Sequence, residues 1–315
     1  MQRDIAEFFW DSILPVIGER HPNAAREMAV QVCGSYGLGV ADEYSDLDAT
    51  IWLDDPLWKE EGGNLQLTLA NHVPRFVPED GPHKNDHAEF VVWPLSWLGD
   101  RKRLLDETSD SAWEKVDIEE LFEIQTNLVL RDPHGLFQRL KEATTPENYP
   151  RALWKKRLIE EMKDLDDDIA DYLQAVRRNR EVEAAIINGR IVERVLQLGF
   201  LVARHYYPWH KHLHWAFLTL PAPASKVCRR LESLTGSGSL NDKLAAVQET
   251  REAYASAILE QGLLTEEILS DLEWAGRLKA WSNANWRKWI ESRQIKAEAA
   301  GYTANDSWIW SLWGW

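Results

Sequence analysis

Cys-Gly-Ser-Tyr-Gly-Leu-Gly at residues 33–39, followed by Ser-Asp-Leu-Asp at residues 45–48, is the part of the chain that decides its fold. An apolar run precedes the first stretch, and a second apolar run follows the second one. These runs predict strands over residues 28–34 and 48–54, with a short helix or loop over residues 36–43 between them. The first strand is followed by a Gly-Ser turn, a short helix, Asp-x-Asp and the second strand. This order is typical of a site that binds a nucleotide and a metal ion.

The two aspartates are spaced as metal ligands on a strand would be. Residues two apart on a strand point to the same side, and a rise of roughly 3.3 Å per residue separates the backbones of Asp46 and Asp48 by about 6.6 Å. Both carboxylates can then reach a pair of divalent cations about 3.5–4 Å apart, the arrangement used for in-line phosphoryl displacement. Carboxylate oxygens without a nearby thiolate or imidazole favour Mg²⁺ or Mn²⁺ over Zn²⁺.

Gly34 and Ser35 are the candidate phosphate ligands. A tight turn at the end of the first strand presents backbone N–H groups and a hydroxyl that can face a triphosphate, and only glycine lets the phosphates come so close. The alternative is an ordinary β-turn with Asp46 as a cap, because Gly, Ser and Asp are common turn residues. The strand-like flanks on both sides favour the nucleotide site over that alternative.

Residues 25–100 resemble the DNA polymerase β-like nucleotidyltransferase superfamily, in particular its small bacterial members and the antibiotic nucleotidyltransferases. The resemblance lies in the two stretches quoted above, and it implies that Ser45 also takes part in nucleotide binding. It further implies a third acidic residue on a later strand, for which Glu89, inside the apolar run at 87–93, is the match. The alternative is that Glu89 marks the solvent face of an amphipathic strand. Other acids near it in sequence are Glu79, Asp80 and Asp86.

A second, less specific resemblance covers the rest of the chain. Residues 131–135, 206–211 and 218–221 resemble the helical C-terminal domain of a bacterial subgroup with mostly unassigned acceptors. The predicted fold is therefore α+β: an α/β nucleotidyltransferase head with a short mixed sheet over residues 1–135, then an all-α helical bundle over residues 136–315. The active site is expected in the cleft between them.

Hydrophobic periodicity predicts most of the helices. Apolar residues recur at helical spacing over 1–18, 158–176 and 187–202, and the last two helices, joined near Asn179, should pack antiparallel. Residues 117–130 are also predicted as a helix, residues 87–94 as a strand and residues 79–86 as a loop bordering the site. Two further helices are expected to begin near Asn241 and Thr265, both of which are N-cap residue types.

Composition narrows the class of protein and of partner. The chain has 315 residues with 44% hydrophobic content, enough for two domains with cores, and its net charge is −15. This charge argues against a nucleic-acid partner and favours a small or cationic acceptor. Cys33 and Cys228 are far apart and form no C-x-x-C pair, which fits a reducing cytoplasm. We expect neither a signal peptide nor a membrane span.

Three remaining features have structural or functional interpretations. A histidine cluster at 210, 212 and 214 suggests a metal site, although only the first and last share a helix face. Arg204 and His210 resemble the Arg…His pair of helical ribonuclease domains, but Pro208 between them should break the helix that such a site needs. A C-terminus rich in Trp over residues 308–315 favours docking in a groove of the chain or in a homodimer over ligand stacking.

The sequence as a whole predicts an enzyme that transfers AMP from ATP to a hydroxyl of a small acceptor, such as an aminoglycoside-like or lincosamide-like antibiotic. Asp46 and Asp48 would hold both metals, and Glu89 would complete the second metal site or take the acceptor proton. Lys211 is the candidate for a triphosphate contact, with a solvated surface lysine as the alternative. Two alternatives keep the fold: an antitoxin-like or regulatory nucleotidyltransferase acting on a protein or tRNA, and a catalytically silent nucleotide-binding module.

Overall fold

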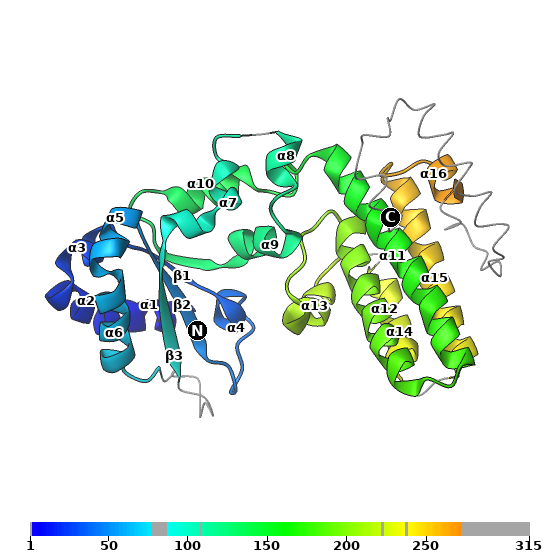
Figure 1. The fold of residues 1–315 in the computed structure, drawn as a ribbon, viewed down its shortest axis with the longest axis horizontal. Helices are drawn as coiled ribbons and strands as arrows, with labels where there is room; N and C mark the ends of the chain where they lie inside the picture. The colour runs from blue at the N-terminus through cyan, green and yellow to red at the C-terminus, as the bar shows by residue number, and fades with distance from the viewer. Residues whose placement is uncertain (1, 77–86, 108, 222–223, 237–238, 272–315) are drawn as a thin grey trace. The chain divides into compact units, whose positions relative to one another are not determined.

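The computed structural model describes residues 2–76, 87–107, 109–221, 224–236 and 239–271 (Figure 1). Contacts divide the chain into two compact units: Met1–Leu153 with Arg204–Leu213, and Trp154–Ala203 with His214–Trp315. The first unit extends past residue 135, after which the sequence predicts a domain boundary. The predicted loop over 79–86 and the Trp-rich C-terminus lie outside the described residues.

A four-stranded mixed sheet forms the centre of the first unit. Its order is β3-β2-β1-β4, with β1 (Ala29–Val32) antiparallel to both β2 (Leu47–Leu53) and β4 (Leu128–Arg131). β3 (Ala88–Pro94) runs parallel to β2. The predicted α+β class and its short mixed sheet are confirmed, since a helical region follows this unit along the chain.

One face of the sheet carries the hydrophobic core. The N-terminal helices α1 (Gln2–Phe8), η1 (Phe9–Ile13) and α2 (Leu14–Arg20), together with α6 (Gly63–His72), pack against it. Strand residues on this face are buried and apolar, among them Val30, Ile51 and Val92. Because side chains alternate along a strand, the residues between them point to the opposite face. The side chains of Asp48 and Glu89 therefore lie on that opposite face.

The remaining elements of the first unit are short. They are α3 (Pro22–Glu27), α4 (Gly34–Gly37), α5 (Asp55–Leu57), η2 (Trp58–Gly62), η3 (Leu95–Leu98), α7 (Asp100–Arg103), α8 (Asp110–Trp113), α9 (Ile118–Thr126) and α10 (Leu136–Ala143). Phe137 of α10 contacts Trp52 on the face of the sheet opposite to the main core, with ring centroids 5.8 Å apart. Helix α10 therefore contributes to covering that second face near β2.

The predicted helix over residues 117–130 is wrong at its C-terminal end. The helix α9 stops at Thr126, and the backbone N–H of Asn127 closes its last turn on the Glu123 carbonyl at 2.9 Å. Leu128–Arg131 then form β4, paired with the free edge of β1. Pairing with β1 satisfies the backbone N–H and C=O groups of these residues. The periodicity of the segment cannot reveal this pairing, because the partner strand lies about a hundred residues earlier.

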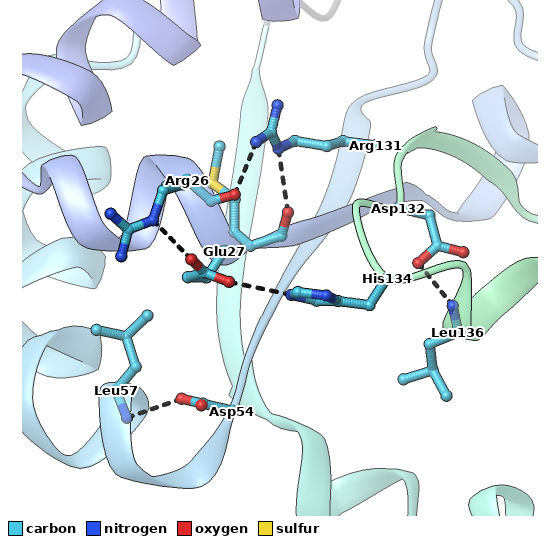
Figure 2. A network of polar contacts seen from close by, with 9 residues as sticks. Arg26, Glu27, Asp54, Leu57, Arg131, Asp132, His134 and Leu136 are labelled. Carbon is cyan, nitrogen blue, oxygen red and sulfur yellow. Dashed lines mark hydrogen bonds and ion pairs between the residues drawn. The ribbon is translucent and has the colours of Figure 1, made fainter.

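A network of polar contacts closes the end of β1 that is farthest from the Gly-Ser turn (Figure 2). Arg131 of β4 donates hydrogen bonds to the carbonyl oxygens of Arg26, at 2.8 Å, and Met28, at 3.2 Å. The Glu27 carboxylate accepts from Arg26 Nε at 2.6 Å and lies 3.1 Å from His134 Nε2. These contacts join β4 and the loop after it to the α3–β1 junction.

The second unit is helical. Its helices are α11 (Arg151–Arg177), α12 (Glu181–Val202), α13 (His210–Phe217), α14 (Ala224–Thr235), α15 (Leu240–Glu260) and α16 (Glu266–Asp271); the first turns of α11 and α13 belong to the first unit. Trp154 Nε1 donates to the Leu201 carbonyl at 2.8 Å, and Arg194 forms ion pairs with Glu161, at 3.0 Å, and Asp168, at 2.7 Å. Later residues of α11 thus contact earlier residues of α12, so the two helices are antiparallel. The predicted antiparallel pair is confirmed.

Both later helices begin near the predicted positions, and Thr265 caps α16 as the sequence predicts. Ser239, rather than Asn241, caps α15, since its hydroxyl accepts from the Asp242 N–H at 3.3 Å. Thr265 Oγ1 accepts from the Ile268 N–H at 3.3 Å, ahead of α16. Within the described ranges, none of the helices combines the length and the apolar composition of a membrane-spanning segment.

Candidate active site

The turn after β1 brings backbone close to an aspartate of β2. The Cys33 N–H donates to the Asp48 carbonyl oxygen at 2.9 Å, and the chain then enters α4 through Gly34, whose φ is +57°. A Cβ at Gly34 would lie 2.9 Å from Asp48 Oδ2, so a side chain there would collide with the carboxylate besides being strained. The positive φ therefore favours glycine at position 34, and any larger residue would also have to displace the Asp48 carboxylate.

Two of the three acids predicted from the sequence, Asp48 and Glu89, lie on adjacent strands. In the parallel pairing of β2 with β3, Asp48 is the partner of Glu89. Asp46 lies two residues before Asp48, just ahead of β2. Their carboxylate oxygens are the donors that Mg²⁺ prefers. With the side chains as they stand, no group of three or more His, Cys, Asp or Glu residues within the described ranges is arranged to hold a metal ion.

The acids interact electrostatically with one another and with two basic residues. Burial raises the pKa of the Asp48 carboxyl, and the Asp46 and Glu89 carboxylates raise it further. Lys211 and His87 oppose this by lowering the pKa of Asp48, and the net direction is upward. A divalent cation placed among these acids would relieve the repulsion between their carboxylates.

Lys211 reaches this region because residues 204–213 belong to the first unit and contact its earlier segments. Tyr206 donates to the Thr145 carbonyl at 3.2 Å, and Arg204 donates to the Pro146 carbonyl at 3.2 Å. Two residues before Lys211, the Trp209 ring N–H donates to the Glu123 carboxylate of α9. The charge of Lys211 therefore acts on Asp48, although the two residues are 163 positions apart in the sequence.

Ser45 acts within its own loop. Its hydroxyl donates to Asp42 Oδ1 at 3.0 Å and accepts from the Asp42 N–H at 3.0 Å, while the Tyr44 N–H donates to the same carboxylate oxygen at 3.0 Å. These bonds lower the pKa of the Asp42 carboxyl. The loop that leads into Asp46 is therefore closed by side-chain bonds of Asp42 and Ser45, and the Ser45 hydroxyl is engaged there.

The thiol of Cys33 lies beside the turn but is unreactive in character. Burial raises its pKa to about 11, so it stays protonated near neutral pH. Asn127 Nδ2 lies 3.5 Å from its sulfur and Thr50 Oγ1 lies 3.7 Å from it. Cys33 therefore fills space between β1, β2 and the end of α9 and offers no nucleophile.

Two residues near the acids were not selected from the sequence. His87 precedes Glu89 by two positions, so alternation places it on the same side as Glu89, and the His-x-Glu spacing was the available signal. Burial raises the pKa of the Glu123 carboxyl, which Arg101 and the Trp209 N–H partly counteract. Glu123 lies on a predicted helix with no motif around it, so no sequence signal could have singled it out.

Comparison with known proteins gives two similarities. Residues 113–215 match a family model described as a domain of unknown function, DUF4037. The crystal structure of a nucleotidyltransferase-like protein from Exiguobacterium sibiricum 255-15 is similar, with a TM-score of 0.38 and 11% sequence identity, over 91% of this chain and 87% of that chain. No protein of curated function matches the sequence.

Proposed function

We propose that the protein is a metal-dependent nucleotidyltransferase that moves AMP from ATP to a hydroxyl of a small acceptor. The observation that carries this proposal is the juxtaposition of the Gly34 turn, Asp48 and Glu89. Glu89 is the register partner of Asp48, and a Cβ at Gly34 would lie 2.9 Å from Asp48 Oδ2, so the missing side chain lets the backbone of the turn come close to the carboxylate. Carboxylates beside a glycine turn and a lysine suit a magnesium-bound triphosphate.

The proposed reaction is a displacement at the α-phosphorus of ATP. The acceptor oxygen forms a bond to this phosphorus while the bond from the phosphorus to the bridging oxygen of the β-phosphate breaks, and pyrophosphate leaves. The acceptor proton goes to a carboxylate, for which Glu89 is our choice because it is exposed beside Asp48. Holding both reactants in line supplies much of the rate enhancement.

The remaining residues have binding roles. Asp46, Asp48 and Glu89 would hold the divalent cations, Mg²⁺ or Mn²⁺, which when bound would stabilise charge on the transferring phosphoryl group. Backbone N–H groups of the first turn of α4, at Gly34 and Ser35, have no partner within the helix and would donate to the β- and γ-phosphates. Lys211 would contact the triphosphate, and Ser45 would hold the loop that carries Asp46.

The acceptor that we propose is small and cationic, of the aminoglycoside or lincosamide type. A net charge of −15 and the carboxylates of the site create a negative field that attracts a cation and repels a polyanion. Incubation of the protein with Mg²⁺, labelled ATP and separate pools of aminoglycosides, lincosamides, proteins and tRNA tests this directly. Label transferred to an antibiotic supports the proposal, whereas label on protein or tRNA would support a regulatory enzyme instead. Nucleotide binding without transfer to any pool would point to a silent binding module.

Nucleotide binding has its own prediction. At one hundred times its dissociation constant, Mg²⁺-ATP should stabilise the folded protein by about 2.7 kcal/mol, which raises the melting temperature by about 5–10 °C. In Ser35→Tyr the added ring should fill the phosphate position, so this shift should disappear in a thermal melt. The matched control is Ser111→Tyr at an exposed position of α8, which should respond to ATP as the wild type does. An ATP response retained by Ser35→Tyr would remove the Gly-Ser turn from the site.

A further inference from the structure

A buried tyrosine hydroxyl next to the Gly-Ser turn has no partner. The Tyr36 residue is 1% exposed, and within the described part of the chain its hydroxyl forms no hydrogen bond. Its ring packs edge-on against Phe76, with ring centroids 5.4 Å apart. A buried phenol normally finds an acceptor, and phenylalanine would fill the same core position without an unpaired polar atom. The hydroxyl at position 36 therefore requires an explanation other than packing.

Carboxylates of the loop that follows α4 act electrostatically on this hydroxyl. Tyr36 follows Ser35 in α4, and the chain returns through residues 38–46 to enter β2. Burial raises the pKa of Tyr36, and the carboxylates of Asp42 and Asp46 raise it further. Asp42 and Asp46 are thus the two anionic acceptors whose charge acts on this hydroxyl.

Of these two acceptors, Asp42 is already engaged in hydrogen bonds and, among the described residues, Asp46 is not. Asp42 is held in place because its carboxylate accepts from the Tyr44 N–H and the Ser45 hydroxyl, each at 3.0 Å. Over the residues that the structure describes, the Asp46 carboxylate forms no hydrogen bond. An ionised carboxylate and a phenol make a short, strong hydrogen bond, and carboxylates that bind metals are usually held by such a bond.

We propose that Tyr36 is a positioning residue for the cation site of the proposed function: its hydroxyl donates a hydrogen bond to the Asp46 carboxylate when that carboxylate turns to hold a divalent cation. The bond pairs the buried hydroxyl and fixes one carboxylate oxygen, leaving the other for the cation. This inference rests on the proposed function, since it assumes that Asp46 is a cation ligand.

The test compares Tyr36→Phe with the wild type in the full-length protein. Binding of Mn²⁺ alone, followed by electron paramagnetic resonance of the free ion, should weaken by about tenfold in the variant. The melting temperature without cation should stay the same or rise, because the substitution removes an unpaired buried polar group. The matched control is Tyr44→Phe at an exposed position of the same loop, which should bind Mn²⁺ like the wild type.

The outcomes separate this inference from the proposed function. Wild-type protein that binds no Mn²⁺, with or without ATP, would overturn both. Equal Mn²⁺ binding by wild type and Tyr36→Phe would overturn only the role of Tyr36. A lower melting temperature in Tyr36→Phe with unchanged Mn²⁺ binding would instead assign the hydroxyl to the fold, through a buried water. A tenfold loss of Mn²⁺ affinity that is matched by a fall in kcat, with the KM for the acceptor unchanged, would support positioning.

Discussion

Asp48→Asn should reduce nucleotidyl transfer by about a thousandfold or more while the protein stays folded. The substitution keeps the shape of the side chain and removes a charged ligand beside the Gly34 turn. Metal-assisted stabilisation of a transferring phosphoryl group contributes several kcal/mol, and each 1.36 kcal/mol is about tenfold in rate. Asp46→Asn should have a similar effect. The measurement is steady-state pyrophosphate release with Mg²⁺-ATP and the acceptor found by the pool experiment.

The stability of the same variant gives a second readout, and its sign follows from the raised pKa of Asp48. Burial makes the ionised form unfavourable in the fold, so the stability associated with this group is present below its unfolded pKa and is lost as pH rises through the folded pKa. At pH 7 the asparagine avoids that cost, and the melting temperature without ligand should equal or exceed that of the wild type. Asp11→Asn, at an exposed position of η1, is the matched control and should keep full activity. Retention of more than a tenth of wild-type turnover by Asp48→Asn would exclude Asp48 as a metal ligand.

Gly199→Ala should destabilise the helical unit strongly. A Cβ at Gly199 would collide with Phe217 Cε2 and would lie 2.7 Å from the Tyr254 hydroxyl oxygen. Both aromatic residues are 0% exposed, and Tyr254 also donates to the Val195 carbonyl at 2.8 Å, so neither ring has room to move. Overpacking of this kind costs about 3 kcal/mol, which lowers the melting temperature by about 6–12 °C.

The same helix offers a matched control for this glycine. Nothing lies within 4 Å of a Cβ at Gly189, which is exposed on α12. Gly189→Ala should therefore raise stability by about 0.5–1 kcal/mol, because alanine loses less entropy than glycine in a helix. Circular dichroism melts of both variants check the pair. Equal melting temperatures for Gly199→Ala and the wild type would mean that α12 and α15 are packed less closely than the structure has them.

The strands and the turn near the N-terminus could be predicted because their causes are local. A glycine is needed at position 34 for a positive φ, and the alternating apolar residues of β2 select one face for the core. The helices α11 and α12 were predictable for the same reason, since their apolar residues recur every three or four positions. The strand β4 was not, because its residues pair with β1 and not with their sequence neighbours.

The sequence by itself determined the class of fold, the Gly-Ser turn and the pair of aspartates at positions 46 and 48. Local backbone preference and side-chain alternation are enough for each of these. Only the tertiary structure decided that Glu89 lies opposite Asp48, that Lys211 acts on the same carboxylate, and that the Tyr36 hydroxyl is buried without a partner. Strand register and the packing of distant segments depend on contacts between residues far apart in the chain, and no local pattern encodes those contacts.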